Sequence, residues 1–256
     1  AVIAAAAQVT ANPNDVVRLR AMFPHVARED VGAAIHQSWL RRRLKDRWGI
    51  DTVFLLTTDG IEQATRHIVS EFHARRLGAL AGTGAHIIDM TCGLGFDAAA
   101  FCDAGFAVTG VEADPDVAII ASHNVPSMTV RSARAETIDI SGAAAVFVDP
   151  ARRDPTAARR IDGATRRATH PETWSPPWSW VQALGQRIPV MAKVAPGIED
   201  EFLDECNVDF VSADGDLVEA LVTMPGRGRR QAVLLTDASE LVVAGGHDTA
   251  ARELGE

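Results

Sequence analysis

The stretch IIDMTCGLGFDAAAF, residues 87–101, decides the fold class. It begins as a short apolar strand that ends at Asp89, continues through a turn that contains Gly93 and Gly95, and leads into the start of a helix. Glycines in such a turn let the backbone approach a ligand closely, and the N-terminus of the following helix points toward that ligand. This order predicts the first unit of a Rossmann-like sheet, with a ligand site at the carboxyl edge of the sheet.

Two kinds of nucleotide cofactor fit a glycine turn of this form. The spacing Gly93-x-Gly95-x-x-Ala98 matches a dinucleotide fingerprint, in which a glycine follows the strand directly and receives the pyrophosphate. Here Asp89 and the spacer Met-Thr-Cys come first, and a carboxylate at this place repels pyrophosphate but suits the ammonium group of a methionine moiety. We therefore predict S-adenosylmethionine as the cofactor and S-adenosylhomocysteine as the product. The predicted contacts from this turn are Asp89, Thr91, Cys92, Gly93 and Gly95.

A second acidic strand end follows in VTGVEADPDVA, residues 108–118. Glu112 lies at the tip of this strand, where a carboxylate can accept hydrogen bonds from both ribose hydroxyls of adenosine. Asp114 is the alternative ribose ligand. Together with Pro115 it better suits the N-cap of the next helix, since aspartate caps well and proline favours the first helical turn.

Beyond residue 85 the sequence alternates between short apolar segments and segments of helix length. Strands that are apolar along their whole length and alternate with helices indicate a parallel α/β sheet covered on both faces. We predict a mostly parallel, Rossmann-like sheet of seven strands in a domain over residues 81–256, preceded by a helical region over residues 1–80. The predicted strands are His86–Met90, Ala107–Glu112, Ser127–Arg131, Ala145–Asp149, Pro189–Val194, Val208–Ser212 and Gln231–Thr236. The predicted helices are Arg28–Trp48, Gly60–Leu80, 96–104, 115–124, 176–186 and 198–205.

The fourth predicted strand runs into the motif AVFVDPARRD, residues 145–154. The side chain of Asp149 and the carbonyl of Pro150 can accept the two N–H bonds of an exocyclic amine and hold its nitrogen toward a sulfonium methyl group. Asp149 would then border both the cofactor and the substrate. The alternative is that Asp-Pro only ends the strand and starts a turn.

Six segments together resemble the bacterial class I methyltransferases that carry a THUMP-like C-terminal domain. They are TTDGIEQAT (57–65), IIDMTCGLGFD (87–97), VEADP (111–115), FVDPARRD (147–154), KVAPGI (193–198) and VSADGDLVEALV (211–222). The resemblance implies an S-adenosylmethionine fold and suggests RNA modification. Two differences accompany it. The motif reads Asp-Pro-Ala-Arg where methyltransferases of base amino groups carry an aromatic residue, and the chain, which ends at Glu256, is too short for the family's C-terminal domain, so we expect a truncated sequence.

Further residues are predicted to complete the cofactor site. The segment RSARAET, residues 131–137, follows the third strand, where such enzymes contact adenine, and its candidates are Ala135 and Glu136. A plain surface loop is the alternative for this segment. Gln63 and Thr65, in the segment before the first strand, are expected to cover the methionine end of the cofactor.

The substrate candidates lie in and beside the long connection from Pro150 to Arg187. Arg152 and Arg153 open an arginine-rich loop at the expected active face, where guanidinium groups can contact phosphate. Trp174 and Trp178 can stack on an unpaired base, and a hydrophobic lid that packs on the sheet is the alternative for both. Lys193 ends a strand beside the fourth and can reach the site, unless it is solvated or salt-bridged. These candidates predict RNA, ribosomal or transfer, as the substrate.

Composition and charge keep other functions open. The formal net charge of −9 argues weakly against a nucleic-acid partner, so a methyltransferase of a small molecule or a protein, a non-catalytic binding module and a dinucleotide-dependent enzyme remain alternatives. No apolar run approaches the roughly 20 residues of a membrane span, so no membrane partner is expected. Cys92, Cys102 and Cys206 show no metal-ligand spacing, so we expect no metal and a reducing cytoplasm. Methylation of uracil carbon 5 is disfavoured, since Cys206 is expected inside a helix and Cys92 in the cofactor turn.

Overall fold

The computed structural model describes residues 1–9, 13–152, 170–236 and 239–244, and the chain forms two compact units, Ala1–Arg66 and His67–Glu256. Helix α5 (His67–Ala81), which the sequence analysis grouped with the N-terminal region, belongs to the second unit. The division into a helical region and a catalytic domain in the functional sense stays a prediction.

The first unit contains helices α1 (Val2–Ala6), α2 (Pro13–Met22), α3 (Arg28–Trp48) and α4 (Thr58–Glu62). α3 has its predicted bounds and ends at Gly49, whose φ of 68° is the left-handed conformation that glycine adopts at helix ends. The helix predicted over Gly60–Leu80 is instead two helices, α4 and α5. α4 starts early because the hydroxyl of Thr57 caps it and accepts a hydrogen bond from the Gly60 N–H at 2.9 Å.

Two arginines of α3 are engaged inside the first unit. Arg41 donates to the carbonyl of Phe54 at 3.0 Å, and Arg43 pairs with Glu62 at 2.8 Å. These contacts hold the segment after α3 and the helix α4 against α3.

The second unit is built on one sheet with the strand order β3-β2-β1-β4-β5-β7-β6-β8-β9. Five neighbouring pairs are parallel, and the pairs β5·β7, β6·β7 and β8·β9 are antiparallel. The strands are β1 (His86–Asp89), β2 (Ala107–Glu112), β3 (Thr129–Ser132), β4 (Ala145–Val148), β5 (Val190–Val194), β6 (Asn207–Ala213), β7 (Asp216–Met224), β8 (Arg230–Thr236) and β9 (Ser239–Ala244).

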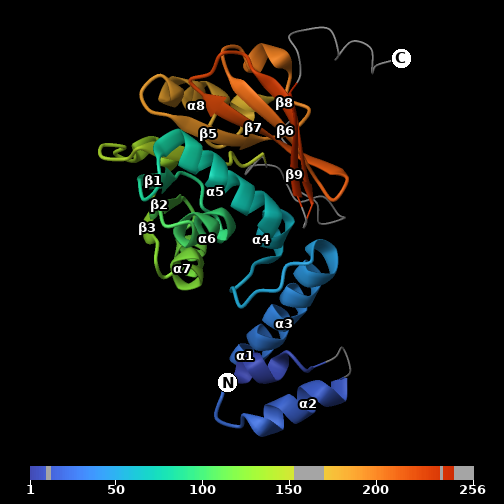
Figure 1. Ribbon diagram of the computed structural model, residues 1–256. Coiled ribbons are helices and arrows are strands. Elements are labelled where there is room, and N and C mark those ends of the chain that lie inside the picture. Colours follow the sequence, from blue (N-terminus) through green and yellow to red (C-terminus); the bar gives the residue numbers. More distant parts are fainter. Residues whose placement is uncertain (10–12, 153–169, 237–238, 245–256) are drawn as a thin grey trace. The chain divides into compact units, whose positions relative to one another are not determined.

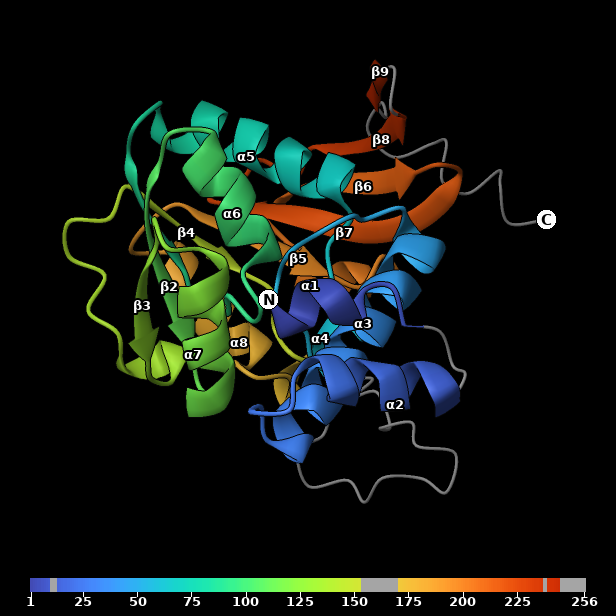
Figure 2. The same ribbon diagram turned by 90° about the horizontal axis from the view of Figure 1, so that it is seen from below.

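Helices cover both faces of this sheet (Figure 1, Figure 2). Strand β4 contacts helices on both faces of the sheet, because successive side chains of a strand point to opposite faces. Phe147 contacts the rings of His73 on α5 and Phe101 on α6 (Phe96–Asp103), with centroids 5.3 and 5.2 Å apart. Val148 belongs instead to the apolar core that α8 (Trp178–Gly185) completes on the other face. α7 (Pro115–Asn124) packs on β2 and β3.

The predicted count of seven strands is wrong, and so is one predicted helix. β7 and β9 were not expected as strands. β7 carries a glutamate inside its apolar run, and its pairing with β5 and β6, far apart in the sequence, is what makes it a strand. Residues 198–205 form only the 3₁₀ turn η3 (Asp200–Phe202), so Cys206 lies buried just before β6 and not in a helix. None of the helices in the described part of the chain is long and apolar enough to cross a membrane.

Candidate active site

The glycine turn after β1 has the geometry that the sequence predicts. Gly93 and Gly95 have φ values of 52° and 93°, which side-chain-bearing residues rarely adopt. A Cβ atom on Gly95 would also come within 2.7 Å of the Val125 side chain. The Cys92 N–H donates to the carbonyl of Val111 at 2.9 Å, which ties the turn to β2. α6 then begins directly after Gly95, with its N-terminus at this edge of the sheet.

Asp89 lies beneath this turn as a buried carboxyl group that is 1% exposed. It accepts a hydrogen bond from the Thr91 N–H at 3.2 Å. Burial raises its pKa well above the usual range, and the nearby carboxylates of Asp97, Asp149 and Glu112 raise it further. Four acidic side chains therefore surround the turn, and such a group of carboxylates attracts cations and repels phosphates.

Glu112 ends β2 on the same edge of the sheet. Its Oε1 accepts a hydrogen bond from the Asp114 N–H at 2.8 Å, and burial raises its pKa against the opposing effect of backbone N–H groups. Asp114 caps α7, accepting from the N–H groups of Asp116 at 2.9 Å and Val117 at 3.3 Å. Asp114 therefore has the helix-capping role that the sequence predicts, and Glu112 as the ribose ligand stays a prediction.

The candidates for adenine contact follow β3. Ala135 and Glu136 lie in the 3₁₀ turn η1 (Ala135–Thr137), and a hydrogen bond of 3.0 Å from the Ala133 N–H to the Glu112 carbonyl brings this turn beside the end of β2. Glu136 pairs with Arg134 at 2.9 Å. Their contact with adenine stays a prediction, as does the role of Gln63, which lies in the first unit.

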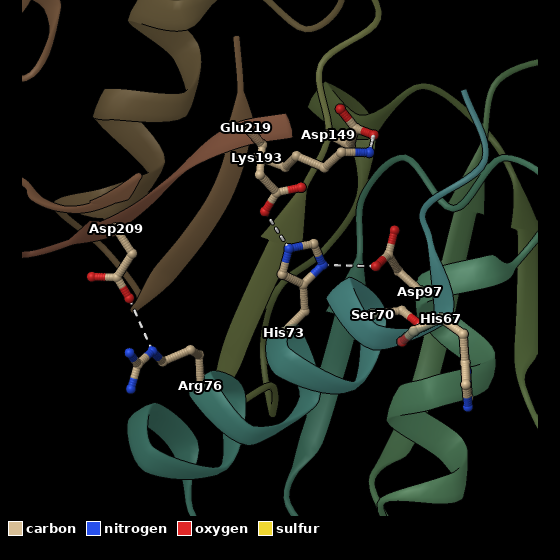
Figure 3. Close-up of polar contacts among 9 residues, drawn as sticks. All are labelled: His67, Ser70, His73, Arg76, Asp97, Asp149, Lys193, Asp209 and Glu219. Atoms are coloured by element: carbon tan, nitrogen blue, oxygen red, sulfur yellow. Dashed lines mark hydrogen bonds and ion pairs between the residues drawn. The ribbon is translucent and has the colours of Figure 1, made fainter. Parts of the chain in front are cut away.

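Asp149 follows β4 and links the cofactor turn to β5. Its N–H donates to the Thr91 hydroxyl at 2.7 Å, and its Oδ2 accepts a hydrogen bond from the Lys193 ammonium at 2.6 Å (Figure 3). Burial opposes the charge on Lys193, but the carboxylates of Asp149, Asp97 and Glu219 outweigh it and raise the Lys193 pKa. Of the alternatives for Lys193, the salt bridge is therefore the one observed.

A second group of charged residues beside this pair was not predicted from the sequence. His73 on α5 is fully buried, and its Nδ1 and Nε2 lie 2.7 Å from Asp97 Oδ1 and 2.5 Å from Glu219 Oε1 (Figure 3). The only sequence signal was that Asp97 and Glu219 interrupt apolar runs in two of the segments quoted above. Since 24 and 146 residues separate them from His73, nothing in the sequence joined them to it.

The predicted base-stacking role of Trp174 and Trp178 is wrong for this structure. Trp178 is 0% exposed and donates its indole N–H to the carbonyl of Phe202 at 2.8 Å, while Trp174 is 5% exposed. Both rings pack in the core between α8 and the sheet, as the lid alternative required, and offer no free face to a base. Arg152 is half-buried, whereas Arg153 and the arginines after it lie outside the described residues.

The two cysteines considered for nucleophilic chemistry do not serve it here. Cys92 is buried under the turn, and burial raises the pKa of its thiol. Cys206 lies before β6 with its thiol 3.3 Å from the Asp204 carbonyl, and burial raises its pKa too. Thiols held in the protonated form are poor nucleophiles.

Comparison with known proteins identifies the fold. No family model matches the chain. Over 199 residues, 74% of this chain and 52% of theirs, it is 28% identical to uncharacterized S-adenosylmethionine-dependent methyltransferases from the CDC 1551 and H37Rv strains of Mycobacterium tuberculosis. The chain thus spans about half the length of the curated relatives it matches. The crystal structure of a proposed methyltransferase from Porphyromonas gingivalis W83 matches 95% of this chain and 65% of its own, with a TM-score of 0.66 and 22% identity.

The fold is therefore the Rossmann-like methyltransferase fold, with a mixed sheet of nine strands. The similarity to these methyltransferases agrees with the predicted class of protein, and the activity of this chain stays a prediction. The narrower resemblance to the family with a THUMP-like domain stays a prediction.

Proposed function

We propose that the chain transfers a methyl group from S-adenosylmethionine to an exocyclic amino group of a base in ribosomal or transfer RNA, in the cytoplasm. The observation that carries the cofactor half of this proposal is the pair of acidic side chains that end β1 and β2 beside the glycine turn, Asp89 and Glu112. A cofactor with an ammonium and a sulfonium group gains from such a field, whereas the pyrophosphate of a dinucleotide is repelled by it.

The residues present fit this cofactor. Asp89 is a buried carboxyl group whose pKa is raised well above the usual range, mainly by burial, so a bound cation would stabilise its ionised form. Glu112 would accept from the ribose hydroxyls, the backbone of Thr91, Cys92, Gly93 and Gly95 would approach the methionine part, and Ala135 and Glu136 would border adenine. When bound, the cofactor supplies an electrophilic methyl group.

Asp149 and Pro150 would hold the amine that receives this methyl group. Lys193 engages Asp149 Oδ2, and in this proposal Oδ1 and the Pro150 carbonyl would accept from the two N–H bonds of the substrate. Positive charge would develop on the nitrogen that receives the methyl group, and the Asp149 carboxylate would stabilise it. Asp149 or solvent would take the surplus proton of the amine.

Fewer observations support RNA as the substrate. The resemblance of the six segments suggests RNA modification, and Arg152 lies three residues beyond the proposed acceptor Asp149. A methyltransferase of a small molecule or protein is the alternative, because the net charge is −9.

The test uses methyl-labelled S-adenosylmethionine and an extract of cells that lack the gene. We expect label in one RNA species, recovered after digestion as a base methylated on an exocyclic nitrogen, and an initial rate of labelling about a hundredfold lower with the Asp149→Ala variant. Label in protein or small molecules and none in RNA would overturn the RNA substrate. Calorimetry in which NAD binds and S-adenosylhomocysteine does not would overturn the cofactor.

A further inference from the structure

Charged side chains from three neighbouring strands meet on the sheet face that α5 and α6 cover. The register pairs Lys193 of β5 with Leu221 of β7, so Glu219, two residues along β7, points to the same face as Lys193. β4 aligns Val148 with Ala192, which brings the next residue, Asp149, beside Lys193. Figure 3 shows these side chains above His73 of α5, at the end of the sheet where the cofactor turn lies.

His73 is the centre of this group and carries a positive charge. Both of its ring nitrogens contact carboxylates, at 2.7 Å to Asp97 and 2.5 Å to Glu219, and an imidazole that donates from both nitrogens is protonated. Asp97 lies in the first turn of α6, where the helix dipole favours its ionised form. One imidazolium thus offsets two buried carboxylates.

This offset decides which partner Lys193 takes. Its ammonium lies 2.6 Å from Asp149 Oδ2, but Asp97 and Glu219 attract it as well. While His73 holds these two carboxylates, Asp149 is the stronger partner. Without the charge of His73, the two buried carboxylates would attract the ammonium more strongly and draw it away from Asp149.

We propose that His73 is a positioning residue for methyl transfer, which keeps Lys193 on Asp149 by neutralising Asp97 and Glu219. The inference rests on the proposed function, because the orientation of Asp149 affects turnover only if Asp149 receives the substrate. Loss of His73 should lower turnover about tenfold, since it displaces the substrate acceptor without removing it. Cofactor affinity should change less than twofold.

The kinetic test compares His73→Gln with His67→Gln. His67 lies on the same helix, its side chain is 75% exposed and pairs with Glu71, so it controls for the substitution itself. We expect the tenfold loss of turnover only in His73→Gln, at temperatures where both variants are folded. Adding Glu219→Gln to His73→Gln removes one competing carboxylate and should restore turnover to within threefold of the wild type. A merely structural role would give no rescue, because the second substitution removes a further contact.

A spectroscopic test needs no substrate. The chain has only two lysines, Lys45 and Lys193, so 15N-lysine labelling gives two ammonium signals in NMR spectra. The Asp149→Asn variant gives the reference position of the Lys193 signal in the absence of the Asp149 carboxylate. We expect His73→Gln to move the Lys193 signal toward that position and to leave Lys45 in place, and the double variant to return it.

The outcomes separate the two proposals. An unmoved Lys193 signal in folded His73→Gln overturns the positioning role. If His73→Gln does not fold, the charge-balanced double variant decides, and a displaced Lys193 signal with a tenfold loss of turnover there overturns the role as well. A moved Lys193 signal together with wild-type methyl transfer by Asp149→Ala supports the link between His73 and Lys193 and overturns the proposed function of Asp149.

Discussion

α5 directs two basic side chains, three residues apart, toward the same sheet, and their surroundings differ. His73 is fully buried between Asp97 and Glu219, next to the pair that Asp149 forms with Lys193. Arg76 is 29% exposed and pairs with Asp209 of β6 at 2.9 Å, away from the carboxyl edge of the parallel strands (Figure 3). The same kind of contact thus borders the candidate site in one place and joins helix to sheet in the other, and we expect the first to affect turnover and the second stability.

His73 with Asp97 and Glu219 forms one cluster, and Arg76 with Asp209 forms the other, the Arg76 cluster. The largest expected difference between the two clusters is the response of their stability to alkaline pH. Burial lowers the pKa of His73, but Glu219 and Asp97 outweigh it and raise the pKa to about 10, against 6.5 for an ordinary histidine. A raised folded-state pKa gives stability that is complete below about pH 6.5 and is lost as pH rises through about 10. The free energy of unfolding should therefore fall between pH 7 and 10 by roughly 1 kcal/mol per pH unit. The contact between Arg76 and Asp209 contains no imidazole.

Urea unfolding at stepped pH measures this difference. We expect the wild type to show the decline and His73→Gln to show a much flatter profile. A decline of equal slope in both proteins would mean that groups other than His73 cause it.

Substitution of the proposed acceptor should have the next largest effect. Asp149→Ala should lower turnover about a hundredfold, equivalent to about 2.7 kcal/mol of transition-state stabilisation, with cofactor affinity largely kept. Steady-state kinetics and calorimetry with S-adenosylhomocysteine measure the two effects separately. Asp139→Ala, which removes an exposed aspartate that bonds Ser141, is the matched control. Wild-type turnover in Asp149→Ala would exclude its proposed role.

Breaking the Arg76 cluster should cost stability instead. Asp209 is 4% exposed on its side chain and lies 2.9 Å from Arg76 and 3.1 Å from Arg229, so Asp209→Ala leaves two guanidinium groups without this partner. Because Arg76 and Arg229 are partly solvated, we expect a loss of about 2 kcal/mol in the free energy of unfolding, below the range for fully buried pairs. Turnover of the folded variant should stay within twofold. A tenfold loss of turnover would show that the Arg76 cluster affects methyl transfer as well, which would contradict the expected difference between the two clusters.

The smallest effect is expected at the rim of the same cluster. Arg75 pairs with Glu240 at 3.0 Å, and its side chain is 51% exposed. Exposed pairs contribute little because water and salt screen them, so Arg75→Ala should change the free energy of unfolding by at most about 0.5 kcal/mol. Thermal unfolding measured beside Asp209→Ala checks this, and comparable losses in both variants would show that burial does not separate them.

Much of the candidate site could be predicted because its residues stand where strands end. Asp89, Glu112 and Asp149 each follow or end a parallel strand, and the carboxyl ends of parallel strands share one edge of the sheet. The glycine turn was readable for the same reason, since Gly93 and Gly95 adopt conformations that are set locally. The predicted and observed positions of these groups therefore agree.

Burial and side-chain pairing could not be predicted from local sequence, because they depend on contacts between distant residues. The sequence around Trp174 and Trp178 is compatible with a base-stacking surface and with a core. Only their packing against the sheet shows that they belong to the core. β7 was missed because a strand that inserts between two others depends on partners distant in the sequence.

The sequence by itself determined the class of fold, the cofactor turn and the acidic residues at the strand ends, because these depend on local backbone geometry and on the alternation of strands and helices. Tertiary structure alone decided that Lys193 pairs with Asp149 and that His73 bridges Asp97 and Glu219. The reason is physical. A buried charge is stable only with a partner, and that partner is chosen by which side chains the folded sheet and its helices bring within hydrogen-bonding distance, whatever their separation along the chain.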